Sequence, residues 1–143
     1  MKILITGIPG TGKTTTGNHL QDKYGFVHYD VESIQTLEGI ENLQGENIVI
    51  TWGFAPDGRD NLPIRNLQNL GYRMIWFDGD RVSARKAFNK RGDVPENLLD
   101  QQMERIDKMD INSFDPIIIN TFDTKGNFLN KDDIIKKIIQ EVG

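Results

Sequence analysis

The segment GIPGTGKTTTG, residues 7–17, restricts the fold of this sequence more than any other feature. It directly follows the apolar run KILIT, residues 2–6, and its Gly7, Gly12, Lys13 and Thr14 fit the phosphate-loop pattern G-x-x-x-x-G-K-[ST]. The pattern needs a buried strand before it and a helix after it, because the loop N–H groups and the helix N-terminus must face one point. We therefore predict a strand over residues 2–6 and a helix over residues 13–24, joined by an anion-binding loop.

Along the rest of the chain, short apolar runs alternate with segments of helical spacing. The runs are rich in β-branched and aromatic residues and predict buried strands at 26–29, 47–52, 72–77 and 116–120. Further helices are predicted at 31–37, 63–70, 81–90, 95–109 and 132–142, the last with Asn130 and Asp133 as its start signal. Strand alternating with helix predicts an α/β fold of the P-loop NTPase type, a three-layer α/β/α sandwich around a five-stranded parallel sheet.

The composition indicates one domain over residues 1–143 and excludes several classes of function. With 21 acidic and 17 basic residues the net charge is -4, which argues against a surface built wholly to bind polyanions. Because no cysteine is present, disulfides, a thiolate zinc site and a cysteine nucleophile are excluded. The first apolar run is too short for a signal peptide or a membrane span, so we expect a soluble, cytoplasmic protein without a membrane partner.

The phosphate loop predicts which residues hold a nucleotide. Its glycines let backbone N–H groups turn toward one point, which the positive end of the following helix also faces. We expect Lys13 to reach the terminal phosphates, the Thr14 hydroxyl to join the Mg²⁺ shell and Thr15 to donate to an inner phosphate. The predicted nucleotide contacts in the loop are thus Gly10, Thr11, Gly12, Lys13, Thr14 and Thr15.

A phosphoryl acceptor needs a carboxylate near the terminal phosphate, to take a hydroxyl proton or to hold the metal. Asp30 is the best candidate, because it follows the second predicted strand at the edge where ligands of open α/β sheets gather. Glu32 projects to the same side if the chain stays extended there, so one carboxylate could serve the metal and the other the acceptor. In the alternative interpretation, Asp30 or Ser33 only caps the next short helix. We interpret His28, inside an apolar strand, as packed rather than catalytic.

The third predicted strand ends at Trp52, where a hydrolytic phosphate-loop protein usually has an acidic metal ligand. Either the metal role shifts to Asp30 or catalysis is weakened. Gly53 would let a substrate approach the backbone closely, and Arg59 and Arg65 could bind an anionic group of the acceptor. The alternative is an ordinary turn with both arginines in solvent.

Residues 81–91 carry five basic side chains and no acidic one, and a glycine follows them. A basic helix that ends at a glycine is typical of a closing lid, which would extend over residues 81–96. In that interpretation Arg91 neutralises charge on the transferring phosphoryl group and Arg85 contacts the nucleotide. The alternative is that the basic side chains form a solvated face.

Asn120 and Thr121 begin the polar loop NTFDTKGN after the last predicted strand. This loop could contact the base of the nucleotide, with Asn120 as the predicted ligand. Alternatively, it is an ordinary exit from the strand.

From these motifs the chain resembles the phosphate-loop kinases of small molecules and nucleotides, a group that includes shikimate, gluconate and adenylate kinases and polynucleotide 5′-hydroxyl kinase. The loop carries the resemblance most specifically. The segment DVE, 30–32, looks like the Asp-x-Asp of shikimate kinases, with Glu32 in place of the second Asp. WGFAPDGR, 52–59, is similar to the Asp-Gly-Phe-Pro-Arg stretch of adenylate kinases, with Trp52 where Asp would stand. VPENLLDQQMERID, 94–107, looks like the segment after the lid of gluconate kinases.

The resemblance implies that the loop strand lies at the centre of the sheet, that ATP and Mg²⁺ are co-substrates, and that a lid closes. Where these kinases often place two lid arginines four residues apart, Arg91 has Ala87 four residues before it.

The leading hypothesis is therefore an ATP- and Mg²⁺-dependent phosphotransferase that uses Lys13, Asp30 and Arg91 in catalysis. Its acceptor would be a small sugar acid, a nucleoside or nucleotide, or a polynucleotide 5′-hydroxyl, and the aromatic residues Trp52 and Phe54 hint at a base. The rival hypothesis is a nucleotide-binding regulatory module with little or no transfer. A GTP switch is disfavoured, because the chain has no Asn-Lys-x-Asp motif.

Overall fold

The computed structural model describes residues 1–8, 10–31, 39, 42–52, 62–79, 81–91, 100–101, 103–104, 106–107 and 110–143. Of residues 62, 63, 81, 88 and 91 it describes the backbone alone. The helix predicted at 31–37 lies almost entirely outside the described residues, as does much of the helix predicted at 95–109.

Five parallel strands form one sheet in the order β2-β3-β1-β4-β5. The strands are β1 (Lys2–Gly7), β2 (Val27–Asp30), β3 (Ile48–Thr51), β4 (Arg73–Asp78) and β5 (Ile117–Asn120). Both ends of each strand lie within one residue of the ends predicted from the sequence. The strand before the phosphate loop is central, as the resemblance implied, because β3 and β4 pair with its two sides. The prediction of a five-stranded parallel sheet is confirmed.

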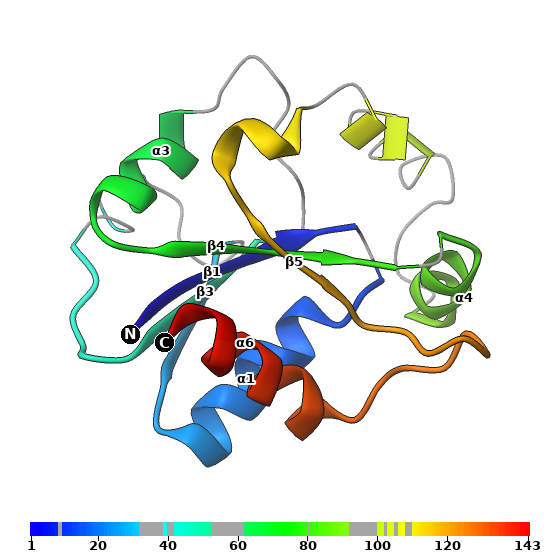
Figure 1. Cartoon of the computed structure of the whole chain (residues 1–143), viewed down its shortest axis with the longest axis horizontal. Helices are drawn as coiled ribbons and strands as arrows, with labels where there is room; N and C mark the ends of the chain where they lie inside the picture. The colour runs from blue at the N-terminus through cyan, green and yellow to red at the C-terminus, as the bar shows by residue number, and fades with distance from the viewer. Residues whose placement is uncertain are drawn as a thin grey trace.

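Helices cover both faces of the sheet (Figure 1). On one face lie α1 (Lys13–Tyr24) and α6 (Lys131–Val142), and on the other lie α3 (Leu62–Asn69) and the 3₁₀ turn η2 (Ile111–Phe114). A further helix, α4 (Arg81–Arg91), follows β4 at the end where that strand stops, and the described residues between 100 and 107 are helical as well. These layers confirm the α/β/α sandwich.

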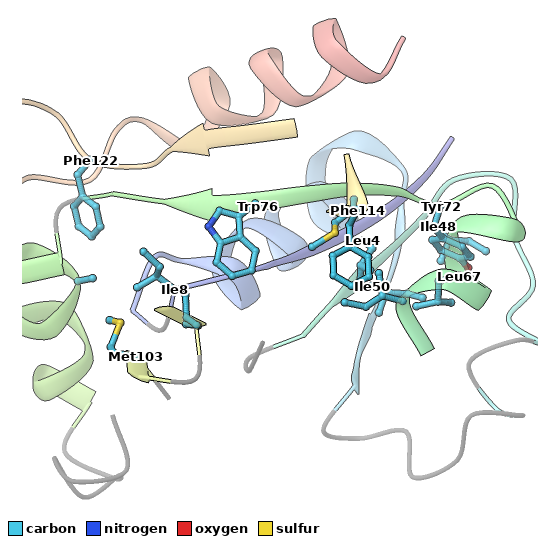
Figure 2. Close-up of a cluster of buried hydrophobic side chains, with 14 residues drawn as sticks. Leu4, Ile8, Ile48, Ile50, Leu67, Tyr72, Trp76, Met103, Phe114 and Phe122 are labelled. Carbon is cyan, nitrogen blue, oxygen red and sulfur yellow. The ribbon is translucent and has the colours of Figure 1, made fainter. Parts of the chain in front are cut away.

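Two apolar clusters hold the layers together, because alternate residues of each strand face opposite sides of the sheet. Trp76 of β4 belongs to the cluster under α3 and η2, with Leu67 and Phe114 (Figure 2). Its neighbours in the strand, Ile75 and Phe77, face α1 and α6 instead. Apolar burial on both faces is what a parallel sheet requires, and it explains why the strands read as continuous apolar runs.

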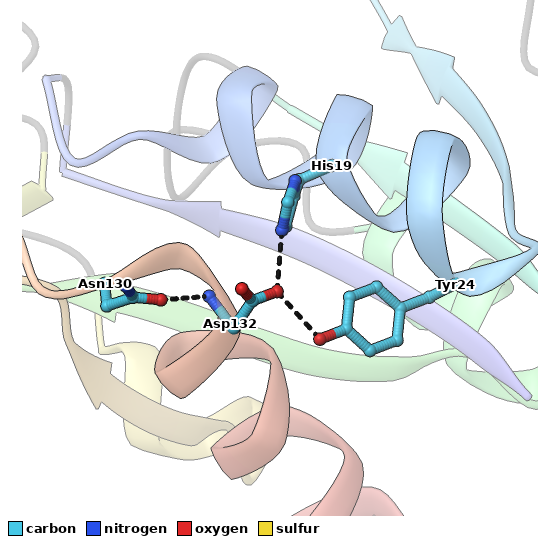
Figure 3. A network of polar contacts seen from close by, with 4 residues as sticks. All are labelled: His19, Tyr24, Asn130 and Asp132. Atoms are coloured by element: carbon cyan, nitrogen blue, oxygen red, sulfur yellow. Dashed lines mark hydrogen bonds and ion pairs between the residues drawn. The ribbon is translucent and has the colours of Figure 1, made fainter.

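A polar contact joins the two helices on one face (Figure 3). Asp132, in the first turn of α6, accepts a hydrogen bond from the Tyr24 hydroxyl at 2.9 Å, and its Oδ1 lies 2.8 Å from Nε2 of His19. The hydrogen bonds from His19 and Tyr24 lower the pKa of Asp132, and the same carboxylate raises the pKa of Tyr24. Asn130 caps α6 as predicted, since its Oδ1 accepts from the Asp132 N–H at 2.8 Å.

Candidate active site

The phosphate loop begins where the backbone of β1 lies close against that of β4. Gly7 has φ +134°, and a Cβ built on it would lie 2.2 Å from the carbonyl oxygen of Phe77. The Ile8 N–H then donates to that same oxygen at 3.0 Å. The first glycine of the motif is thus required by the neighbouring strand, which fixes the start of the loop.

The rest of the loop presents an open helix end. Gly10 and Gly12 have φ of 81° and 86°, a left-handed conformation that favours glycine. Gly12 caps α1 without a side-chain hydrogen bond. Helix N-termini carry backbone N–H groups without helical partners and the positive end of the dipole. Thr11 is buried and its hydroxyl donates to the Ile8 carbonyl at 2.6 Å, so it shapes the loop.

Lys13 lies inside the loop, with 5% of its surface exposed. Its Nζ donates to the carbonyl oxygens of Gly7 at 3.2 Å and Ile8 at 2.8 Å. The ammonium group is therefore held against the backbone at the start of the loop. Thr14 and Thr15 follow in the first turn of α1 with exposed side chains, where their hydroxyls are accessible to a ligand.

Asp30 lies at the same edge of the sheet as the loop. It is the last residue of β2, half-buried, and pairs in register with Thr51 at the end of β3. Since β3 alone separates β2 from β1, and neighbouring strands are about 4.8 Å apart, Asp30 lies about 10 Å across the sheet from Ile5, two residues before the end of β1. Asp30 is thus placed beside the loop, on the β3 side of it.

His28 links three elements behind this edge. Its Nε2 lies 2.7 Å from the Thr51 hydroxyl of β3, and its Nδ1 lies 2.8 Å from Oδ1 of Asn18 on α1. Burial lowers the pKa of His28, and the nearby Asp30 carboxylate partly opposes this. The neutral ring can donate from one nitrogen and accept at the other, which suits both contacts. His28 is packed, as predicted, but its two hydrogen bonds were not foreseen.

The His28 ring also explains a glycine within α1. A Cβ on Gly17 would lie 2.5 Å from Nε2 of His28. We expect Gly17→Ala to lower the free energy of unfolding by about 1 to 3 kcal/mol, although alanine is the better helix former. Removing the ring with His28→Ala should make Gly17→Ala nearly harmless, giving a coupling energy of about 1 kcal/mol or more in a double-mutant cycle measured by urea denaturation. Additive losses would contradict this account of Gly17.

Trp52, the residue in place of the expected acid, packs against the core. Its side chain is half-buried and packs against the cluster under α3, and its backbone N–H donates to the Ile5 carbonyl at 2.9 Å. The residue that directly follows β3 therefore has an apolar side chain and offers no carboxylate at that position.

Other predicted site residues are described in part or lie outside the described residues. Glu32, Gly53 and Arg59 lie outside them, and of Arg91 the backbone alone is described, at the end of α4. Arg85 pairs with Asp100 through a short ion contact. Arg65 places its guanidinium 4.9 Å from the centre of the Phe114 ring, a cation–π contact. The roles predicted for these side chains remain predictions.

The loop after β5 is a tight hairpin. Phe122 and Phe128 form an antiparallel bridge, and the Asp123 N–H donates to the Asn127 carbonyl at 2.8 Å. The Asp123 carboxylate accepts the N–H groups of Lys125 and Asn127 at 2.8 and 2.9 Å. At its start, Oδ1 of Asn120 accepts the Phe122 N–H at 2.9 Å, so this atom shapes the loop. Nucleotide binding by Asn120 stays a prediction.

A pocket of about 700 Å³ lies between this hairpin and α4. Its described lining is aromatic and basic: Phe122 and Phe128, with Lys86, Lys90 and Lys125, joined by Ser83, Ala87, Asn89, Gly126 and Asn127. The sequence motifs predicted no role for either phenylalanine. The sequence feature that could have indicated them is a pair of aromatic residues within an otherwise polar loop.

Within the described ranges, no group of three or more His, Asp or Glu side chains is arranged to hold a metal ion. Oxygen donors that suit Mg²⁺ do stand near the loop, namely the exposed Thr14 hydroxyl and the Asp30 carboxylate. No helix in the described part of the chain is long and apolar enough to cross a membrane.

Comparison with known proteins places this geometry in a known fold. A gluconokinase structure from Sinorhizobium meliloti 1021 matches with a TM-score of 0.65 and 15% identity, over 99% of this chain and 90% of that one. A shikimate kinase structure from Bacteroides thetaiotaomicron matches with a TM-score of 0.62 and 14% identity, over 99% and 98% of the two chains. The chain thus has the α/β fold of the phosphate-loop kinases.

A sequence match points the same way. The Adenylate kinase isoenzyme 6 homolog of Caenorhabditis elegans is 50% identical over 44 residues, which cover 31% of this chain and 22% of that protein. The match therefore spans about a fifth of the relative's length. No protein-family model matches the chain.

Proposed function

We propose that this protein is an ATP- and Mg²⁺-dependent phosphotransferase that moves the terminal phosphoryl group to a small-molecule, nucleoside or nucleotide, or polynucleotide 5′-hydroxyl acceptor. The observation that carries the proposal is the juxtaposition of Lys13, buried within an open phosphate loop, and Asp30, at the same edge of the sheet. The fold shared with gluconokinase and shikimate kinase structures supports it.

Each residue has a role that follows from its position. The Lys13 ammonium and the N-terminus of α1 bind the β- and γ-phosphates. Asp30 accepts the proton of the acceptor hydroxyl as that oxygen attacks the γ-phosphorus, and ADP leaves with the bridging oxygen. Arg91, at the end of α4, neutralises charge on the transferring group.

Mg²⁺ would be held by the Thr14 hydroxyl and the Asp30 carboxylate, both oxygen donors of the kind it prefers. When bound, it neutralises phosphate charge and orients the terminal phosphate. Because Asp30 is assigned to both the metal and the proton, its replacement should affect turnover much more than nucleotide affinity.

The proposed activity is tested by ADP release from Mg-ATP with pooled acceptors. Four pools would be used: nucleosides, nucleoside monophosphates, 5′-hydroxyl oligonucleotides and sugar acids, each against a reaction without acceptor. Stimulation by one pool is the expected result, and dividing that pool identifies the acceptor. If ATP binds but no pool stimulates ADP release, the protein is a nucleotide-binding regulatory module, an alternative that the apolar Trp52 directly after β3 favours.

Asp30→Asn should lower acceptor-dependent turnover by about 10²-fold or more, because the amide can neither take a proton nor neutralise Mg²⁺. The affinity for ATP, measured by calorimetry, should stay within about 2-fold, since the loop itself is unchanged. Asp22→Asn, an exposed carboxylate in the last turns of α1, is the matched control and should retain full turnover. Wild-type turnover in Asp30→Asn would remove Asp30 from the mechanism.

A further inference from the structure

His28 and Asp30 lie on the same side of β2, because side chains two residues apart in a strand point to the same face of the sheet. This face is the one that α1 covers, since His28 contacts Gly17 and Asn18 of that helix. Tyr29, between them, packs on the opposite face with the cluster under α3. The Asp30 carboxylate therefore belongs to the layer of α1.

The first turn of α1 lies opposite Asp30. The helix starts directly after the loop and packs on β2 and β3 below the sheet (Figure 1). Because β1, β2 and β3 are parallel and α1 returns from the carboxyl end of β1, the helix runs antiparallel to β2.

The spacing along both elements matches. From His28 to Asp30 the strand advances about 6.6 Å toward the loop edge of the sheet. From Asn18 back to Thr14 the helix advances about 6 Å in the same direction, and residues four apart share one helix face. Since His28 contacts Asn18, Asp30 is placed opposite Thr14.

The His28 ring fills the space between these elements. In the neutral ring, Nδ1–H donates to Oδ1 of Asn18 at 2.8 Å, and Nε2 accepts from the Thr51 hydroxyl at 2.7 Å. Thr51 is 1% exposed and pairs in register with Asp30, so the ring reaches β3 in the same row as the carboxylate. The close approach of the ring to Gly17 shows that it lies directly against the helix backbone. The imidazole thus joins β2, β3 and α1.

We propose that His28 is a positioning residue, which sets the separation between the Asp30 carboxylate and Thr14 at the start of α1. The inference rests on the proposed function, because these are the two residues assigned there to Mg²⁺. A group that holds metal ligands in place without touching the metal commonly changes metal affinity by about 10- to 100-fold when it is removed. A rigid ring that is hydrogen-bonded at both nitrogens holds two elements at a fixed separation.

The test measures how strongly Mg²⁺ tightens ATP binding. ATP would be titrated into the protein by calorimetry, once in excess EDTA and once in excess Mg²⁺, and the ratio of the two Kd values isolates the contribution of the metal without any turnover. His28→Ala should reduce this ratio about 10-fold, because Asp30 is no longer held opposite Thr14. The affinity for ATP in EDTA should stay within about 2-fold, since Lys13 and the loop are unchanged.

His19→Ala is the matched control, since it removes the other histidine of the chain. His19 joins α1 to α6 through its 2.8 Å contact with Asp132 (Figure 3). Both variants therefore loosen the packing of α1, but His28 alone of the two contacts the row of Asp30. His19→Ala should lower the free energy of unfolding in urea and leave the Mg²⁺ ratio at the wild-type value.

Thr51→Val tests whether the ring acts through its contact with β3. Valine keeps the shape of the side chain but lacks the hydroxyl that donates to Nε2. The variant should reduce the Mg²⁺ ratio, and the double variant should be no worse than His28→Ala alone, because both changes remove one shared contact. Additive reductions would contradict this route.

The outcomes separate this inference from the proposed function. An unchanged Mg²⁺ ratio in His28→Ala would overturn the positioning role. An equal reduction in His28→Ala and His19→Ala would overturn it as well, because general loosening of α1 would then be the cause. A wild-type protein that binds no ATP would overturn the proposed function. A wild-type protein that binds ATP equally well with and without Mg²⁺ would overturn the assignment of the metal to Thr14 and Asp30, and the role of His28 with it.

Discussion

Lys13→Ala should reduce acceptor-dependent phosphotransfer by roughly 10²- to 10³-fold and should also weaken ATP binding. The reason is the position of the ammonium group, which is 5% exposed and hydrogen-bonded to the carbonyls of Gly7 and Ile8. A charge fixed in a buried position stabilises phosphate charge far more than a solvated one does. Its loss also leaves two loop carbonyls without this donor.

The matched control is Lys23→Ala, a lysine in the last turn of the same helix. Both variants remove one positive charge from α1, but Lys23 lies at the end of the helix remote from the loop. Turnover measured by ADP release should stay near wild type in Lys23→Ala. If the two variants lost activity equally, net charge would be the cause, and the loop geometry would not explain catalysis.

Gly7→Ala should lower the free energy of unfolding by about 3 to 5 kcal/mol, the upper end of the effects expected from one substitution. The added Cβ would lie 2.2 Å from the Phe77 carbonyl oxygen and 2.7 Å from the Phe77 nitrogen, and both are backbone atoms of the adjacent strand. Relieving this clash would require β1 and β4 to separate at the centre of the sheet. The left-handed φ adds a further cost of about 1 to 2 kcal/mol.

Gly25→Ala separates the cost of the left-handed backbone conformation from the cost of the clash with the adjacent strand. Gly25 has φ +75° and nothing lies within 4 Å of a built Cβ. Alanine at this position therefore has an unfavourable backbone conformation but no steric clash. We expect a loss of about 1 kcal/mol in urea denaturation. Losses of the same size in Gly7→Ala and Gly25→Ala would contradict the assignment of Gly7 to strand packing.

Much of the fold could be predicted because it depends on local sequence patterns. The runs that became β1 and β4 are apolar on both faces, and such a run between turn signals indicates a buried parallel strand. The stripe from Ile134 to Val142 predicted α6 within a residue of its start. The positions of Lys13 and Thr14 could be predicted because the spacing of the phosphate-loop motif places them at the start of the helix.

The missed features depend on contacts between distant segments. The hydrogen bond between His28 and Thr51 requires the register of β2 on β3, which a single sequence does not specify. The pocket requires the hairpin after β5 to fold beside α4, and the two segments are separated by more than 30 positions in the sequence. Asp30 was placed correctly at the sheet edge because its position depends on one strand end alone.

The two tryptophans of this chain provide a label-free spectroscopic readout of the site. They flank the central strand: Trp76 pairs in register with Thr6, and the backbone N–H of Trp52 donates to the Ile5 carbonyl. Trp76 is 1% exposed, so its emission should be blue-shifted and should change when the protein unfolds. Trp52 is half-buried on the Asp30 side of β1, and its emission should report an acceptor arriving there. A Trp52→Phe variant would separate the two signals, so acceptor binding and global unfolding can be followed in one cuvette.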